Sequence, residues 1–218
     1  MIICAATGNA GKLKEIRRIL EAQGHTVKSQ KEFGITLEPE ETGTTFEENA
    51  QIKAKEICAA SGLPTLADDS GLMVDALNGA PGVYSARYCG RHGDDEANND
   101  KLLAELAHVP QQQRQAKFVS AVCLYLPNGK QVTYLGECPG SITFERRGEN
   151  GFGYDPLFVP DCVGLAQGGV APNTQGRTYA ELEAFEKDAI SHRGKAMELL
   201  DQNLAQFLQD AEAMEPAE

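Results

Sequence analysis

The chain begins with Ile2-Ile-Cys-Ala-Ala6, continues through Thr7-Gly-Asn-Ala-Gly-Lys12, and then places apolar residues at helical spacing. This succession predicts a buried strand, a glycine-containing turn and an amphipathic helix. Such a turn aims backbone N–H groups at an anion, and the helix N-terminus and Lys12 add positive charge. The turn is not a Walker A loop, because only two residues separate Gly8 from Gly11. From this segment alone, a phosphate-binding loop and an ordinary turn with a solvated lysine are both open.

Helix and strand patterns alternate along the first part of the chain, and strand patterns cluster in the middle. Helices are expected at residues 45–61, at 95–107 and over the apolar stripe from 197 to 208. Strands are expected near residue 27 and at 63–69, 117–126, 131–138, 141–146 and 156–159, with loops at 71–93 and 160–177. Asn128-Gly129 predicts a type I′ hairpin turn. The whole pattern predicts an α/β fold in which a mixed sheet carries a second lobe.

Composition restricts the classes of protein that the chain can belong to. Its 218 residues are 41% apolar and carry 20 Lys and Arg against 32 Asp and Glu, a net charge of −12. That balance supports a folded core and argues against non-specific binding to nucleic acid or to an anionic membrane. No apolar run reaches the length of a signal peptide or a membrane span. The six cysteines are widely spaced, which favours reduced thiols in a cytoplasmic protein.

Two acidic segments are candidates for a metal site. Asp68-Asp69 ends an apolar strand, where ligands bind in open α/β sheets, and Glu38-Pro-Glu40-Glu41 precedes the second helix. Adjacent strand residues point to opposite faces, so only one of Asp68 and Asp69 is expected to enter a given site. Carboxylates from two segments suit Mg²⁺, which completes its octahedron with water and phosphate oxygens. A solvated acidic face is the alternative for residues 38–41.

Two further segments contain residue types that suit a nucleotide base. In Gly151-Phe-Gly-Tyr-Asp-Pro156, Phe152 and Tyr154 could stack on a base, and Asp155 could bond to it or brace the loop. The alternative is a turn with structural aromatic residues. Lys187-Asp-Ala-Ile-Ser-His-Arg193 concentrates cations in an acidic chain, which suits phosphate or a base edge. Its alternative is a helix start with ordinary ion pairs.

Six motifs occur together and in chain order, and this combination is far more specific than any one of them. They are Thr7-Gly-Asn-Ala-Gly-Lys12, Glu41-Thr-Gly with Phe46-x-x-Asn-Ala50, Ala67-Asp-Asp-Ser-Gly71, Gly79-x-Pro-Gly-x-Tyr-Ser-Ala-Arg87, Gly151-Phe-Gly-Tyr-Asp-Pro156 and Ser191-His-Arg193. Together they resemble the inosine triphosphate pyrophosphatase family, the dITP/XTP diphosphatases that remove non-canonical purines from the nucleotide pool. The resemblance runs from residue 1 to about 208.

The resemblance implies one catalytic domain of two lobes over residues 1–218, with a long central mixed sheet flanked by helices and an active site in the cleft between the lobes. It implies a cytoplasmic homodimer that hydrolyses ITP, dITP or XTP to the monophosphate and pyrophosphate with Mg²⁺. The segment 162–177 and the acidic tail from about 209 to 218 depart from the family pattern, and the tail is expected to fray.

The resemblance also implies roles for individual residues. Asp69 is expected to be catalytic, serving the metal and the attacking water, with Glu41 as the second metal carboxylate and Glu40 as the alternative. The expected substrate-binding residues are Thr7, Gly8, Asn9, Ala10, Gly11, Lys12, Ser70, Phe152, Gly153, Tyr154, Asp155, Lys187, His192 and Arg193. The first six would hold the triphosphate, Ser70 would touch the substrate, and the others would form the pocket for base and sugar.

Two rival functions use the same residues. A phosphotransferase would need a second acceptor pocket and would release a phosphorylated product in place of pyrophosphate. A nucleotide sensor would keep Lys12 and the loop 152–155 but show no metal-dependent turnover. Asp69 and the neighbouring acids disfavour the sensor, because carboxylates repel a bound polyanion unless a metal lies between them.

Overall fold

The computed structural model describes residues 1–213, which divide into two compact units. Unit 1 comprises Met1–Asp69, Ala121–Leu135 and the segment from Lys195, and unit 2 comprises Ser70–Ser120 and Gly136–Gly194. The chain passes from one unit to the other inside regular elements, so three strands and one helix contribute residues to both. No helix within residues 1–213 has the length and apolar character needed to cross a membrane.

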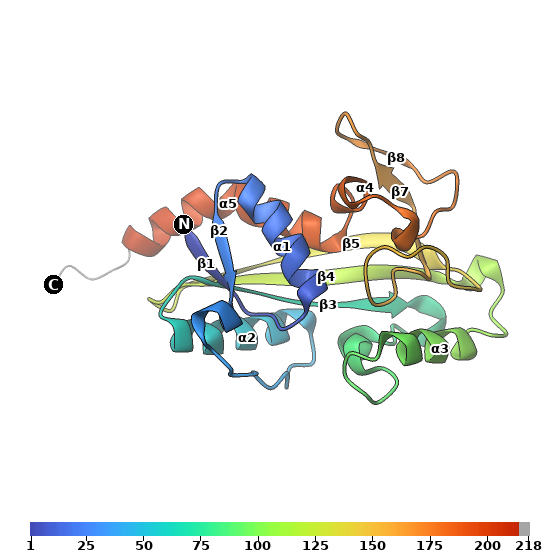
Figure 1. Ribbon diagram of the computed structural model, residues 1–218, viewed down its shortest axis with the longest axis horizontal. Coiled ribbons are helices and arrows are strands. Elements are labelled where there is room, and N and C mark those ends of the chain that lie inside the picture. Colours follow the sequence, from blue (N-terminus) through green and yellow to red (C-terminus); the bar gives the residue numbers. More distant parts are fainter. Residues whose placement is uncertain (214–218) are drawn as a thin grey trace. The chain divides into compact units, whose positions relative to one another are not determined.

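Six strands form a mixed sheet, which confirms the predicted α/β class (Figure 1). Hydrogen-bonded neighbours follow the order β2-β1-β3-β4-β5-β6. Their bounds are Ile2–Ala5 for β1, Thr26–Ser29 for β2, Thr65–Val74 for β3, Gln115–Tyr125 for β4, Gln131–Ile142 for β5 and Phe158–Pro160 for β6. β1 pairs in parallel with β2 and β3, and β5 pairs antiparallel with β6. The last residues of β1, Cys4 and Ala5, therefore lie beside the first residues of β3, Thr65 and Leu66, in unit 1.

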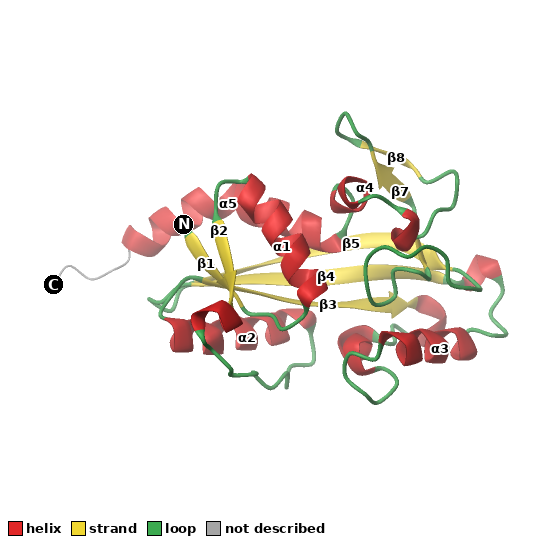
Figure 2. Ribbon diagram, in the orientation of Figure 1, coloured by secondary structure: helices red, strands yellow, loops and turns green. Residues whose placement is uncertain are grey.

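Two helices, α2 and α3, begin and end close to the predicted positions, α5 extends five residues beyond the predicted stripe at each end, and α4 was not predicted (Figure 2). The helices are α1 at Ala10–Ala22, α2 at Phe46–Ser61, α3 at Asp95–Glu105, α4 at Ala184–Asp188 and α5 at His192–Ala213. Local sequence sets the ends of α2. Thr45 and Glu48 form a reciprocal capping box, and Gly62 takes the left-handed conformation, φ 67°, that ends the helix. Short 3₁₀ segments lie at Gln30–Phe33, Asp75–Leu77, Gly82–Arg87, Gln111–Gln113 and Tyr179–Glu181.

Each unit has its own apolar core. In unit 1, buried residues of β1 to β4 pack against α1 and α5, while α2 covers the opposite face of these strands (Figure 2). Both faces of the strands are thus covered, and Cys4 and Cys123 are fully buried. In unit 2, Phe118, Phe158 and Tyr179 form an aromatic centre with ring centroids 4.8–5.6 Å apart. These cores support β3 and the loops that carry the candidate site.

The structure corrects three predicted strand boundaries. β3 continues through Gly71 to Val74, so the predicted loop 71–93 begins later than expected. The predicted strands 131–138 and 141–146 are wrong, because β5 is a single strand from Gln131 to Ile142. Gly140 does not interrupt β5 but permits close packing: a Cβ at this position would meet the carbonyl oxygen of Val159 and lie 2.7 Å from the Phe158 ring.

Two predicted turns or loops also differ from the structure. The type I′ turn is wrong, because Asn78 is the one non-glycine residue with positive φ within the described chain, whereas type I′ needs positive φ at Asn128. The ring of Pro127 restricts the φ angle of that residue, and the turn between β4 and β5 contains Gly129 with a φ of 85°. The predicted loop 160–177 contains a small hairpin of β7, Cys162–Gly164, and β8, Val170–Pro172. The predicted frayed tail is helical through Ala213, and its remainder lies outside the described residues.

Candidate functional site

The turn between β1 and α1 is held by its own side chains. Asn9 caps α1, because its Oδ1 accepts the Lys12 N–H at 3.0 Å, while the Asn9 N–H donates to Thr7 Oγ1 at 3.1 Å. The first intrahelical bond runs from the Leu13 N–H to the Asn9 carbonyl, so the N–H groups of Ala10 and Gly11 precede it. Gly8 to Ala10 are exposed. A preformed helix N-terminus is therefore open to an anion.

Lys12 and Asp68 join this turn to the first half of β3. Lys12 Nζ lies 3.3 Å from Asp68 Oδ2, and the Asp68 side chain is fully buried. Asp68 thus faces α1, whereas Asp69 contacts residues of α2. The prediction that the two adjacent carboxylates point apart is confirmed. Asp68 fixes the Lys12 ammonium beside the turn, which is a bracing role.

Asp69 lies at the centre of a second polar cluster in unit 1. Asn49 Nδ2 donates to Asp69 Oδ2 at 3.0 Å, and Lys53 Nζ lies 3.5 Å from Asp69 Oδ1 and 2.7 Å from Glu41 Oε1. Burial raises the pKa of Asp69 above its usual range, although the ammonium groups of Lys53 and Lys12 oppose the shift. Burial opposes the charge on Lys53, but Asp69 and Glu41 more than offset it, and the Lys53 pKa is raised.

This cluster fits a divalent cation chemically. Glu41 and Asp69 come from separate segments and converge on one cation, the Lys53 ammonium, whereas Glu40 is exposed. Within residues 1–213 no group of three or more His, Cys, Asp or Glu side chains forms a metal cluster. Mg²⁺ does not need one, since it binds one or two carboxylates and takes its other ligands from water and phosphate. The geometry favours Glu41 over Glu40 as the partner of Asp69.

In unit 2, the loop 151–155 is held by a buried ion pair. Asp155 Oδ2 accepts both the Lys187 ammonium at 2.7 Å and the Phe152 N–H at 3.0 Å, and Asp155 and Lys187 are 3% and 6% exposed. Asp155 therefore braces the loop, one of the two roles left open by the sequence. The Lys187 ammonium also lies over the half-buried Phe152 ring, 5.2 Å from its centroid.

Tyr154 belongs to the core of unit 2. The residue is 4% exposed, its hydroxyl donates to the Ser85 carbonyl at 2.8 Å, and burial raises its pKa above the usual value. The structure therefore does not present Tyr154 for stacking on a base. A buried phenol is stable where its hydroxyl finds an acceptor, and Ser85 supplies one. Of the two loop aromatic residues, Phe152 is the one with an accessible ring.

The first residues of α5 are also buried, and the helix begins earlier than the apolar stripe of the sequence predicted. His192 stacks on Phe118 with ring centroids 4.8 Å apart, and Arg193 Nη2 donates to Ser70 Oγ at 3.0 Å. Arg193 is 1% exposed, so its guanidinium is fixed by its surroundings. Ser70, His192 and Arg193 thus belong to unit 2, whereas Asp69, the residue before Ser70, belongs to unit 1.

Comparison with known proteins identifies the family. The family model described as the Ham1 family matches residues 3–203. The chain belongs to the Ham1 family. A Haemophilus influenzae protein named dITP/XTP pyrophosphatase is 52% identical over 204 residues, which span 93% of this chain and 98% of that protein.

Solved structures agree with this assignment. A HAM1 protein from Coxiella burnetii has a TM-score of 0.78 and 40% identity, covering 94% of this chain and 99% of its own. A Mycobacterium abscessus protein described as a nucleoside-triphosphatase / dITP/XTP pyrophosphatase has a TM-score of 0.69 and 48% identity, covering 92% and 98%. The resemblance inferred from the motifs and the predicted mixed α/β fold are both confirmed.

Two residues of this candidate site, Asn49 and Lys53, are not predicted by the sequence analysis, which includes Asn49 only as part of a motif. A signal was present, because Asn49 and Lys53 are four residues apart and so share one face of α2. What the sequence lacked was the location of that face, which the fold places against Asp69.

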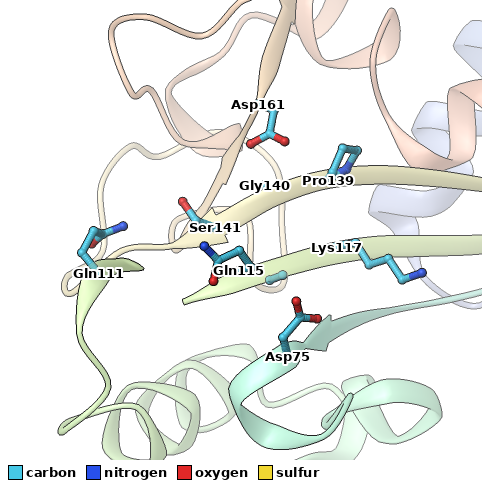
Figure 3. Close-up of a pocket in the computed structure, with 9 residues that line it drawn as sticks. Asp75, Gln111, Gln115, Lys117, Pro139, Gly140, Ser141 and Asp161 are labelled. Carbon is cyan, nitrogen blue, oxygen red and sulfur yellow. The ribbon is translucent and has the colours of Figure 1, made fainter. Parts of the chain in front are cut away.

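A separate cavity of about 420 Å³ lies in unit 2 of the Ham1 fold (Figure 3). Asp75 follows β3, Gln115 and Lys117 belong to β4, and Ser141 belongs to β5. The other lining residues are Gln111, Ala116, Pro139, Gly140 and Asp161. None of the predicted site residues lines it, and Lys117 Nζ donates to Glu137 at 2.7 Å. The cavity is therefore distinct from the residues that the family motifs single out.

Proposed function

We propose that this protein hydrolyses non-canonical purine nucleoside triphosphates, ITP, dITP and XTP, at the α–β phosphoanhydride, giving the monophosphate and pyrophosphate. The observation that carries the proposal is the buried Asp69, held by Asn49 and Lys53 in the same unit as the open N-terminus of α1. High identity to proteins named dITP/XTP pyrophosphatase over nearly the whole chain supports it.

In this proposal the α1 turn binds the triphosphate. The N–H groups at the start of α1 and the Lys12 ammonium neutralise phosphate charge, and Asp68 keeps Lys12 in position at 3.3 Å. Phosphoryl transfer depends mainly on positioning and on charge neutralisation. A turn that is fully formed before substrate arrives avoids the cost of ordering it on binding.

Asp69 orients the attacking water. Asn49 holds one carboxylate oxygen and Lys53 lies beside the other, so the carboxylate plane is fixed. Glu41 and Asp69 would hold Mg²⁺, which when bound supplies positive charge to the phosphate oxygens. Lys53 keeps these two carboxylates together and limits their mutual repulsion.

The residues of unit 2 select the base. Hypoxanthine and xanthine carry a 6-oxo acceptor, whereas adenine carries a 6-amino donor, so a fixed donor at this position rejects ATP. Guanine shares the 6-oxo group but carries a 2-amino donor, so a second donor near position 2 penalises GTP. Arg193 and backbone N–H groups are donors only, and Arg193 is buried and fixed by Ser70. Phe152 offers a ring face to the base, and Asp155 with Lys187 holds its loop.

We further propose that the protein acts in the cytoplasm as a homodimer. The six cysteines are all free thiols, as expected in a reducing compartment that also contains the nucleotide pool. Light scattering coupled to gel filtration tests the dimer, whose mass would be twice the 23.5 kDa of one chain. A mass of one chain at micromolar concentration would contradict it.

The test of the reaction is a pyrophosphate-release assay over ITP, XTP, GTP and ATP, with Mg²⁺ and with excess chelator. We expect pyrophosphate from ITP and XTP, little from GTP and ATP, and none in chelator. Asp69→Asn should abolish turnover while ITP binding persists, because kcat and kcat/KM fall together when an interaction specific to the transition state is lost. Asp75→Asn, the same change at an exposed acid outside the site, is the matched control. Orthophosphate as first product, full activity in chelator, or wild-type kcat in Asp69→Asn would refute the proposal.

A further inference from the structure

Two side chains of α3 bind the backbone of the loop that is proposed to hold the base. Asp95 Oδ2 accepts the Gly153 N–H at 2.8 Å, and Asn99 Nδ2 donates to the Gly153 carbonyl at 2.9 Å. The two residues are four apart and therefore lie on one face of the helix. Both peptide groups of Gly153 are thus bound by the first turns of α3.

Gly153 lies at the centre of the loop 151–155, and these two side chains hold its backbone. Its φ is +62°, a left-handed conformation, and it lies between Phe152 and Tyr154. The neighbouring residues have other anchors, since the Phe152 N–H bonds to Asp155, and Tyr154 bonds to Ser85. Without Asp95 and Asn99 the centre of the loop would lose both of these backbone hydrogen bonds.

α3 is itself well placed to act as a support. Asp94 caps it through a 3.0 Å bond to the Ala97 N–H. Asn98, 2% exposed, accepts the Cys89 N–H at 2.8 Å and so ties the helix to the segment that follows Gly82–Arg87. Asn99 is 1% exposed, so its amide is confined by packing. A confined donor loses little conformational entropy when it bonds Gly153.

We propose that Asp95 and Asn99 are positioning residues for substrate recognition: they hold Gly153, and with it Phe152, in the conformation that discriminates between purine bases. This inference rests on the proposed hydrolysis of purine nucleoside triphosphates. The two residues act on base recognition and not on the phosphorus chemistry, which belongs to Asp69. Their loss therefore changes KM and base selectivity and leaves kcat at saturating ITP nearly unchanged.

Two isosteric substitutions distinguish loss of the hydrogen bond to Gly153 from loss of side-chain volume. Asp95→Asn keeps an oxygen that can accept the Gly153 N–H, whereas Asn99→Asp replaces the N–H₂ donor with an oxygen that repels the Gly153 carbonyl. Asp95→Ala removes the first bond outright. Glu96→Gln, one residue away on an 82% exposed side chain, controls for lost charge. Asp94→Ala weakens the helix cap without touching Gly153 and controls for lost stability.

Each variant is assayed for kcat and KM with ITP and GTP, and amide hydrogen exchange is measured for a peptide covering residues 150–157. We expect Asp95→Ala and Asn99→Asp to raise the KM for ITP about three- to tenfold, as losing one hydrogen bond would, and to narrow the ITP/GTP selectivity. Exchange in the loop should rise in the same two variants. Asp95→Asn, Glu96→Gln and Asp94→Ala should keep wild-type KM and selectivity.

Several results would overturn the inference. One is a Glu96→Gln or Asp94→Ala enzyme that loses selectivity as much as Asp95→Ala. Another is faster loop exchange in Asp95→Ala with unchanged KM and selectivity, and a third is an equal fall of kcat for ITP and GTP. Failure of the proposed function is recognised separately, since wild-type protein would then release no pyrophosphate from ITP. In that case the exchange measurement still decides whether Asp95 and Asn99 hold Gly153.

Discussion

Lys53 and Asp69 should be energetically coupled in the folded protein, and a double-mutant cycle of Lys53→Met and Asp69→Asn measures that coupling. The Lys53 ammonium lies between Glu41 and Asp69, and the side chains of Lys53 and Asp69 are only 12% and 7% exposed. Lys53→Met leaves two carboxylates close together without their shared cation. Adding Asp69→Asn to Lys53→Met removes one of those two negative charges. The double variant should therefore be more stable than Lys53→Met alone.

The distance gives the size of the effect. Opposite unit charges 3.5 Å apart attract by about 5 kcal/mol at an effective dielectric constant of about 20. Desolvation of both groups offsets part of this attraction, so we expect a coupling free energy of about 2–3 kcal/mol. Lys53→Met alone should lower the free energy of unfolding by about 3–5 kcal/mol, because it breaks a buried pair. It should also raise the pKa of Asp69 further, since Lys53 opposes the effect of burial.

Urea denaturation at neutral pH, with EDTA present so that no divalent cation joins the carboxylates, gives the four free energies of unfolding. Lys55→Met, an exposed lysine on the same helix, is the control and should change stability by less than about 0.5 kcal/mol. The contrary result is a change in the free energy of unfolding of the double variant that equals the sum of the two single changes within about 0.5 kcal/mol. In that case the Lys53 ammonium does not stabilise Asp69, and the description of the cluster is wrong.

Three further outcomes are expected. Lys12→Ala should raise the KM for ITP about ten- to a hundredfold in steady-state assays, which corresponds to the free energy of a charged hydrogen bond. An unchanged KM in folded protein would place the α1 turn away from the phosphates. Burial raises the thiol pKa of Cys4 and Cys123 to about 11, so both should stay neutral and unmodified by iodoacetamide at pH 8. The half-buried Cys89 and Cys162 should be alkylated. Mass spectrometry of the native protein after treatment checks both expectations. Gly140→Ala should lower the free energy of unfolding by about 1–3 kcal/mol, because the added Cβ meets Val159 and Phe158. The control is Gly8→Ala, where the added Cβ has open space around it. Equal melting temperatures of the two variants would contradict the packing argument.

Local chemistry explains which elements the sequence predicted well. The bounds of α2 follow from Thr45, Glu48 and Gly62, which act on their own neighbours in the chain. Gly140 shows the opposite case: a Pro-Gly pair normally suggests a break, but here the glycine allows β6 to approach within a continuous strand. That approach is a tertiary contact, and no local pattern reports it.

The same distinction applies to the candidate site. Divergence of Asp68 and Asp69 follows from strand geometry and was predictable. The role of Asp155 was not, because its partner Lys187 is 32 residues away. In the sequence Lys53 looks like an ordinary surface lysine, because only the folded structure shows that its face of α2 lies against Asp69. Tyr154 likewise resembles a base-stacking residue until the core of unit 2 encloses its ring.

In the proposed reaction, water attacks the α-phosphorus of a purine nucleoside triphosphate. Hydrolysis of ITP in ¹⁸O-labelled water, followed by mass spectrometry of both products, shows which phosphorus is attacked. We expect one heavy oxygen in the inosine monophosphate and none in the pyrophosphate. Heavy oxygen in the pyrophosphate, or labelled orthophosphate as the first product, would contradict the proposed reaction.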